Sequence, residues 1–127
     1  MRRLFLSFQM EDRNQVNGVR LMKWNKAMDL DFYDESVRIA YKSTSAEYIR
    51  RRIREKISRC SATVCFLGKT TYQSEWVNWE LYTSMRMGKE VLLMGLPNGP
   101  ERLSLPQAVS HMRWFLWNPN QLSRFAE

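Results

Sequence analysis

The sequence is poor in cysteine and histidine, and this scarcity excludes several kinds of site. It holds two cysteines, Cys60 and Cys65, and one histidine, His111. The cysteines are five positions apart, so they form no CxxC motif, and a single histidine does not complete a metal-binding set with them. We therefore expect no metal and two buried, reduced thiols.

Long apolar runs are also missing. No stretch of about 18 apolar residues is present, so the sequence predicts no membrane-spanning helix. The apolar run that begins at Leu4 ends at Phe8 and gives way to Gln9-Met10-Glu11-Asp12. This run is too short for the apolar core of a signal peptide. We expect a soluble, cytoplasmic protein that has no membrane partner.

Internal repeats and low-complexity segments are absent from the sequence. A chain of 127 residues with 44% hydrophobic content is long enough for one core and too short for two. We predict a single domain over residues 1–127. The 20 Lys and Arg outnumber the 13 Asp and Glu and give a net charge of +7. This excess favours anionic partners without identifying one.

Short apolar runs alternate with amphipathic segments along the whole chain. The runs predict five strands at Arg3–Phe8, Leu30–Tyr33, Ala62–Leu67, Glu90–Gly95 and Arg113–Trp117. The other segments predict helices over 16–28, 45–59 and 75–87, a short helix at most within 103–110, and a terminal helix from Pro119. Such alternation implies right-handed crossovers and a parallel sheet with helices on both faces. We predict an α/β, flavodoxin-like three-layer sandwich with a five-stranded parallel sheet in the order 2-1-3-4-5, whose ligand crevice opens beyond strands one and three.

The helix over 45–59 carries a cluster of basic residues: Arg50, Arg51, Arg52, Arg54, Lys56 and Arg59. One interpretation is a patch for phosphate backbones or anionic lipids, and the other is a solvated helix face. We favour the solvated face, because the basic residues spread around the helix and no aromatic platform interleaves with them. We expect no nucleic-acid partner.

The helix over 75–87 carries a carboxylate, Glu80, that has no ion-pair partner on its own helix. It lies between the apolar stripe of the helix and the flank that holds Trp76. Its neighbours three and four positions away are Trp76, Val77, Thr83 and Ser84, none of them basic. Such a carboxylate must pair with a distant cation, raise its pKa, or face a cleft. The expected fold brings Glu80 close to the crevice, which favours a functional role.

Three segments of the sequence together resemble the TIR-like family. They are Leu4-Phe5-Leu6-Ser7-Phe8, then Phe32-Tyr33-Asp34-Glu35-Ser36, then Val64 to Lys69 leading into Ser74-Glu75-Trp76-Val77-Asn78-Trp79-Glu80. The resemblance covers residues 3 to about 96 and is closest to the stand-alone branch that includes the TIR component of Thoeris anti-phage defence. It implies a flavodoxin-like fold and, in enzymatic members, cleavage of the nicotinamide glycosidic bond of NAD to ADP-ribose or to cyclic ADP-ribose isomers that act as second messengers.

The resemblance also implies roles for individual residues. The family's catalytic glutamate matches Glu80, and the residues matched to substrate binding are Ser7, Phe8, Asp34, Ser36 and Trp76. Asp34 and Ser36 match the end of strand two, where TIR domains carry the BB loop used in self-assembly. NAD is then a substrate and no cofactor is needed. The implied partners are other copies of the chain in a homo-oligomer and an effector that reads the nucleotide product.

The chemistry of the reaction agrees with a single carboxylate. Nicotinamide leaves as a neutral molecule and needs little acid catalysis, whereas the ribose develops oxocarbenium character that a nearby carboxylate stabilises. The sequence leaves hydrolysis and cyclisation both open. The segment from Asp34 to Thr44 lacks the Gly and Pro residues common in the BB loop. The alternative is therefore a non-catalytic TIR-like module for protein interaction and self-assembly.

Overall fold

The computed structural model describes residues 2–28 and 41–127. Three expectations lie outside the described residues: the strand Leu30–Tyr33 and the candidate site residues Asp34 and Ser36. Strands and α-helices alternate along the described part, except that one α-helix before residues 29–40 and one after them follow each other.

The sheet of the described part has three parallel strands in the order β1-β2-β3. They are β1 (Leu4–Ser7), β2 (Ala62–Leu67) and β3 (Glu90–Gly95). Every residue of β2 is buried, because β2 has a neighbouring strand on each side and both faces of the sheet are covered. The predicted bounds of β2 and β3 are confirmed, and β2 is central as expected.

One parallel bridge extends the sheet at each edge, from Leu4 to Met28 and from Met94 to Phe115. The prediction of a strand over Arg113–Trp117 is wrong, because Phe115 alone pairs with the sheet. Its N–H donates to the Leu93 carbonyl at 2.9 Å, and its carbonyl accepts the Gly95 N–H at 2.8 Å. The described residues thus form three of the five expected strands.

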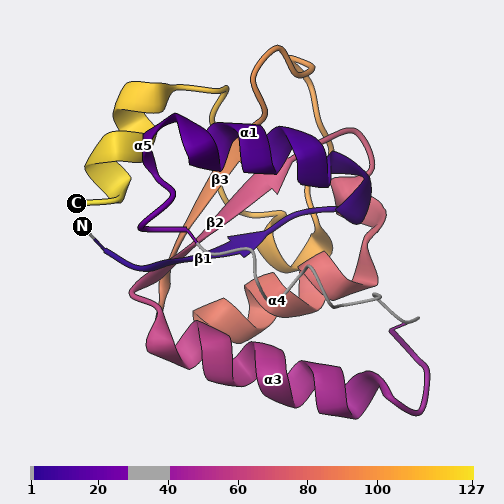
Figure 1. The fold of residues 1–127 in the computed structure, drawn as a ribbon. Helices are drawn as coiled ribbons and strands as arrows, with labels where there is room; N and C mark the ends of the chain where they lie inside the picture. The colour runs from indigo at the N-terminus through magenta and orange to yellow at the C-terminus, as the bar shows by residue number, and fades with distance from the viewer. Residues whose placement is uncertain (1, 29–40) are drawn as a thin grey trace.

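Helices lie on both sides of the sheet, so the described part has three layers (Figure 1). α1 (Arg13–Lys23) and α5 (Pro119–Phe125) lie on one side, and α3 (Ala46–Arg59) and α4 (Glu75–Arg86) lie on the other. Three short 3₁₀ helices complete the described elements: η1 (Met10–Asp12), η2 (Thr71–Gln73) and η3 (Gln107–Val109).

The alternation of side chains along β2 shows how the layers are filled. Cys65 and Leu67 pack in one apolar cluster with Val77 and Leu81 of α4. Val64 and the other alternate residues of β2 point to the opposite face and join the larger cluster of the core. Burial of both faces explains why β2 reads as a continuous apolar run.

The first helix begins and ends earlier than the predicted 16–28. η1 leads directly into α1 at Arg13, and the helix stops at Lys23. Trp24 and Met28 are buried beyond its end, and Met28 reaches the edge of the sheet beside Leu4. Burial of these apolar residues therefore overrides a helical periodicity that would have kept the chain in α1.

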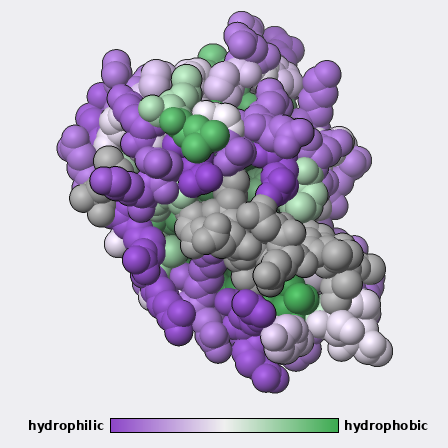
Figure 2. Space-filling model, viewed as in Figure 1, coloured by the Kyte–Doolittle hydropathy of each residue, from purple (hydrophilic) through white to green (hydrophobic). Residues whose placement is uncertain are grey.

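The surface seen in Figure 2 is mostly hydrophilic, with a hydrophobic group of atoms over α1. That helix carries two exposed apolar side chains, Leu21 and Met22. Among residues 2–28 and 41–127, no helix has the length and apolar character needed to cross a membrane.

Candidate functional site

Glu80 is completely buried, and its carboxylate is held by the end of the first strand. The Ser7 hydroxyl donates to Oε1 of Glu80 at 2.7 Å, and both residues have 0% of their surface exposed. Ser7 is the last residue of β1, whereas Glu80 lies in the middle of α4. The fold thus brings together two site residues that are 73 positions apart in the chain.

Local signals at both ends of α4 set the position of Glu80. The Ser74 hydroxyl accepts the Val77 N–H at 3.1 Å and caps the first turn. Gly88 follows the helix with a φ of +73°, a left-handed conformation that glycine adopts without the strain of a Cβ. Both caps act locally, so the sequence itself carries the signals for the two ends of α4.

Two buried hydroxyls, those of Thr63 and Ser84, anchor α4 one turn after Glu80. Ser84 Oγ donates to the Glu80 carbonyl at 2.9 Å and lies 2.8 Å from Thr63 Oγ1 of β2. Because the only hydroxyl proton of Ser84 goes to that carbonyl, the Thr63 hydroxyl donates to Ser84. This chain of hydrogen bonds fixes the Glu80 backbone against the sheet.

Cys65 lies beside Ser7 in the sheet, since the two residues are direct partners in the parallel register of β1 and β2. Its thiol is buried, and burial raises its pKa strongly, with the nearby Glu80 charge adding to the rise. Cys65 therefore stays a neutral thiol near pH 7 and does not act as a nucleophile. Both cysteines are free and buried, as expected from the sequence.

The two thiols are accordingly expected to be almost inert in the folded protein. A thiol reagent added at pH 8 should label neither Cys60 nor Cys65 within minutes, and both should react at once after unfolding in urea. The absorbance of the chromophore that the reagent releases on reaction measures how many thiols are labelled. Rapid native labelling of Cys65 would contradict the burial described here.

The two aromatic candidates differ in their surroundings. Phe8 is fully buried and belongs to the main core. Trp76 is 7% exposed, and its ring makes edge contacts with Tyr41 at 5.2 Å and with Trp79 at 6.1 Å between centroids. Sequence reasoning missed Tyr41 and Trp79, whose rings join that of Trp76 in one aromatic group. Of the three residues, Trp76 lies one turn before Glu80 on α4, Trp79 directly precedes Glu80, and Tyr41 lies outside α4.

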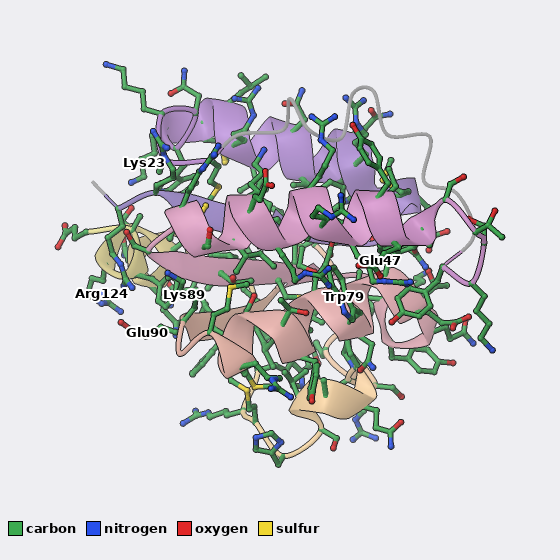
Figure 3. The ribbon with its side chains drawn as sticks, turned by 90° about the horizontal axis from the view of Figure 1, so that it is seen from below. Lys23, Glu47, Trp79, Lys89, Glu90 and Arg124 are labelled. Carbon is green, nitrogen blue, oxygen red and sulfur yellow. The ribbon has the colours of Figure 1, made fainter. Side chains whose placement is uncertain are left out.

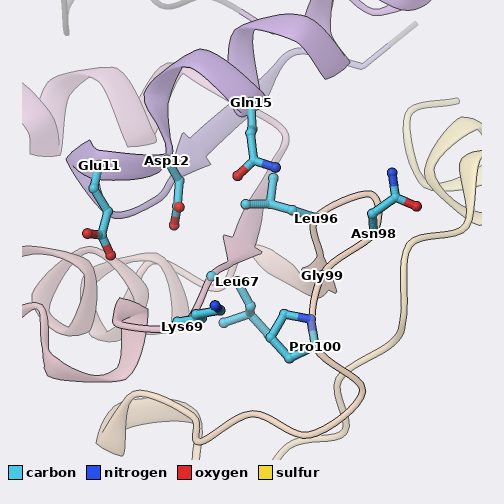
Figure 4. A pocket seen from close by; sticks show the side chains of 10 residues that line it. Glu11, Asp12, Gln15, Leu67, Lys69, Leu96, Asn98, Gly99 and Pro100 are labelled. Atoms are coloured by element: carbon cyan, nitrogen blue, oxygen red, sulfur yellow. The ribbon is translucent and has the colours of Figure 1, made fainter.

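A separate pocket opens beyond the carboxyl ends of β2 and β3, with a volume of about 330 Å³ (Figure 4). Acidic residues of η1, Glu11 and Asp12, face Lys69 across it. Burial, and next the Glu11 carboxylate, raise the pKa of Asp12. Glu80 does not line this pocket. The crevice was expected beyond the strands at Arg3–Phe8 and Ala62–Leu67 and close to Glu80. The pocket instead lies beyond β2 and β3, and the buried carboxylate belongs to the α4 side of the sheet.

Gly68 shapes the wall of this pocket. A Cβ at that position would overlap the Asp12 carboxylate, so a side chain there would force the Asp12 side chain to move. The loop is tied further by the Gly68 N–H, which donates to the Thr71 hydroxyl at 2.8 Å, and by the Thr70 hydroxyl, which donates to Glu11. No group of three or more metal-ligating side chains occurs among the residues that the structure describes.

Comparison with known proteins identifies the family. The sequence model described as Thoeris protein ThsB, TIR-like domain, matches residues 5–101, which is most of the chain. No curated protein sequence matches significantly. Among solved structures, the fold is similar to that of the TIR domain of the Toll-related receptor TRR-2 from Hydra magnipapillata, with a TM-score of 0.63 and 12% sequence identity.

The superposition with that receptor domain covers 98% of this chain and 90% of the other. At this low identity the likeness shows a shared fold and nothing about activity. The family match and the fold agree with the motifs that surround Ser7, Trp76 and Glu80. The chain belongs to the Thoeris ThsB TIR-like domain family.

Proposed function

We propose that this protein cleaves the bond between nicotinamide and ribose in NAD, with Glu80 as the catalytic carboxylate. The observation that carries the proposal is the geometry of Glu80 itself. A fully buried carboxylate, oriented by a hydroxyl at 2.7 Å, stands at the position that matches the catalytic glutamate of enzymatic TIR-like proteins. Buried carboxylates are costly in a fold, and they are frequent at functional sites.

In the proposed reaction the carboxylate faces the ribose of the nicotinamide half of NAD. As the glycosidic bond lengthens, positive charge develops on the ribose, and Glu80 stabilises it in surroundings that contain little water. Nicotinamide leaves with the electron pair of the broken bond and is neutral. Water then attacks the ribose and loses a proton to give ADP-ribose, or a nucleophile of the same molecule attacks to give a cyclic ADP-ribose.

Ser7 serves as a positioning residue in this account. Its hydroxyl holds Oε1 of Glu80 in one orientation, so no reorganisation of the carboxylate is needed when the charge develops. The hydroxyls of Thr63 and Ser84 hold the backbone of the same residue. These two hydroxyls anchor the helix backbone, whereas the Ser7 hydroxyl orients the carboxylate itself.

Glu80 has no exposed surface in this structure, so NAD reaches it only after a rearrangement that uncovers the carboxylate. We propose that self-assembly of the domain produces this open state, and that the nucleotide product is read by a separate effector. Activity should then rise more steeply than in proportion to protein concentration. Nicotinamide release, measured over a hundredfold range of protein concentration, tests both the reaction and its dependence on assembly.

The burial of the same pair also favours a second candidate, a non-catalytic interaction module. In that case the hydrogen bond from Ser7 to Glu80 only joins β1 to α4. This candidate predicts oligomers that release no nicotinamide and whose unfolding temperature does not rise when NAD is added.

The variant Ser7→Ala tests the positioning role of Ser7 in the proposed reaction. Removing the donor takes one hydrogen bond from a buried charged group, at a cost of about 1–3 kcal/mol. If the cost falls on the transition state, kcat drops by about 5- to 150-fold.

Ser84→Ala is the matched control, because it removes a buried hydroxyl that bonds the Glu80 backbone and not its carboxylate. It should lower the unfolding temperature while kcat stays within about threefold. Equal kcat values for Ser7→Ala and the wild type would remove Ser7 from the mechanism.

A further inference from the structure

Two arginines on α3 converge on a single glutamate carboxylate. Glu47 Oε1 accepts from a terminal nitrogen of Arg54 at 2.7 Å, and its Oε2 accepts from Nε of Arg50 at 3.2 Å. Each oxygen of the carboxylate is therefore taken by a different guanidinium. We call Arg50 and Arg54 the two-arginine fork. The arrangement matches what two guanidinium groups make with the oxygens of a phosphate.

Aromatic rings hold both arms of the fork in place. The Arg50 guanidinium lies over the Tyr41 ring at 4.9 Å and also donates to the Tyr41 carbonyl at 3.1 Å. The Arg54 guanidinium lies over the Trp79 ring at 5.8 Å. Stacking of this kind restricts the arginine side chains, so less conformational entropy is lost when they bind a ligand. The solvated face expected from the sequence thus includes two arginines that are fixed by rings from outside α3.

The fork lies next to the residues that lead to Glu80. Tyr41 and Trp79, which support its arms, both contact the ring of Trp76, one turn before Glu80 on α4. Figure 3 shows Glu47 of α3 and Trp79 of α4 on the same side of the molecule, where the two helices run beside each other. An anion held by the fork is therefore close to the site proposed above.

Glu47 is itself a weak occupant of the fork. Its side chain is 55% exposed, whereas those of Arg50 and Arg54 are 21% and 40% exposed. Its pKa is lowered by Arg54 and then by Arg50, which shows the positive field between the two arms. Exposed ion pairs contribute little to stability, so a ligand with more negative charge can displace this carboxylate.

We propose that the two-arginine fork binds the diphosphate group of a dinucleotide, and that Glu47 occupies the same place when no ligand is bound. A diphosphate brings two negative charges and several acceptor oxygens, against one charge and two oxygens for Glu47. Arginine suits this task because its planar donors match phosphate oxygens in pairs. The identity of the ligand as NAD rests on the proposed function, whereas diphosphate binding does not.

Calorimetric titration with inorganic pyrophosphate and with ADP-ribose tests the site. Glu47→Gln frees the fork and should tighten binding of both by at least about fivefold, about 1 kcal/mol. The double variant Arg50→Gln, Arg54→Gln should weaken both by more than tenfold. The single variant Arg54→Gln should weaken them by a smaller factor, which keeps the test valid if the double variant does not fold.

Two controls on the same helix separate a built site from general positive charge. Arg51→Gln removes one exposed positive charge outside the fork, and Glu55→Gln removes one exposed negative charge outside it. Each should leave the dissociation constants within about twofold of the wild type. Equal weakening by Arg51→Gln and Arg54→Gln, or equal tightening by Glu55→Gln and Glu47→Gln, would overturn the inference.

Kinetics with NAD distinguish failure of this inference from failure of the proposed function. Loss of the fork should raise KM while kcat changes little, because the diphosphate is bound equally in the ground state and the transition state. If NAD is cleaved with the same KM in every fork variant, the fork is not the diphosphate site and the proposed function stands. If pyrophosphate binding behaves as expected and NAD is not cleaved, the fork stands and the proposed function fails.

Discussion

Glu80→Gln is expected to abolish nicotinamide release while leaving the fold intact. Glutamine has the same shape, and its carbonyl oxygen still accepts the Ser7 hydroxyl that bonds Oε1 at 2.7 Å in the wild type. The negative charge that stabilises the ribose in the transition state is lost. Removal of one such electrostatic group from a buried site costs about 10²- to 10³-fold in kcat.

Glu75→Gln is the matched control for this variant. Glu75 lies in the first turn of the same helix and is exposed. The substitution therefore removes an equal charge outside the buried site. Its nicotinamide release should stay within about twofold of the wild type, with both variants showing cooperative thermal unfolding. Full activity in Glu80→Gln would assign the catalytic role to another residue.

Phe8→Ala is expected to cause the largest loss of stability among the candidate site residues. Phe8 has 0% of its surface exposed and packs in the main core directly after β1. Truncating a buried phenylalanine to alanine costs about 3–5 kcal/mol, a large part of the stability of an ordinary domain of about 5–15 kcal/mol. The midpoint of urea unfolding, followed by tryptophan fluorescence, measures the loss.

Two further variants tell a core role of Phe8 from a substrate-binding role. Phe8→Leu keeps most of the buried volume and should cost less than about 1.5 kcal/mol. If Phe8 only packs, KM and kcat of Phe8→Leu stay near wild type, and if it is a platform for nicotinamide, KM rises. Tyr72→Ala, which truncates an exposed ring, should shift the urea midpoint little. An equally small shift for Phe8→Ala would contradict its place in the core.

Local sequence signals were sufficient for the elements that hold the site. The branched and apolar run Ala62–Leu67 reads as a buried strand because both of its faces are covered. Ser74 and Gly88 mark the ends of α4 because their side-chain chemistry and backbone freedom act locally. The prediction of a strand over Arg113–Trp117 was wrong. Strand pairing depends on hydrogen bonds to β3 that are not visible in the local sequence, and only Phe115 makes a bridge to β3.

The contacts of the site depend on packing between residues that are distant in the sequence, so they were harder to predict from the sequence. Glu80 could be singled out because it lacks a cation on its own helix, but its partner Ser7 follows from how β1 and α4 meet. The rings of Tyr41 and Trp79, which lie outside α3, hold arginines that the sequence alone predicted to be part of a solvated face. Asp34 and Ser36 lie outside the described residues and remain predictions from the family resemblance.

Mass spectrometry of NAD after incubation with the assembled wild type and with Glu80→Gln tests the central claim most directly. The account predicts that the wild type converts NAD to nicotinamide plus ADP-ribose, or to nicotinamide plus a cyclic ADP-ribose, which is lighter than ADP-ribose by one water. It predicts intact NAD with Glu80→Gln. Intact NAD with the assembled wild type, or equal conversion by the two proteins, would contradict the account.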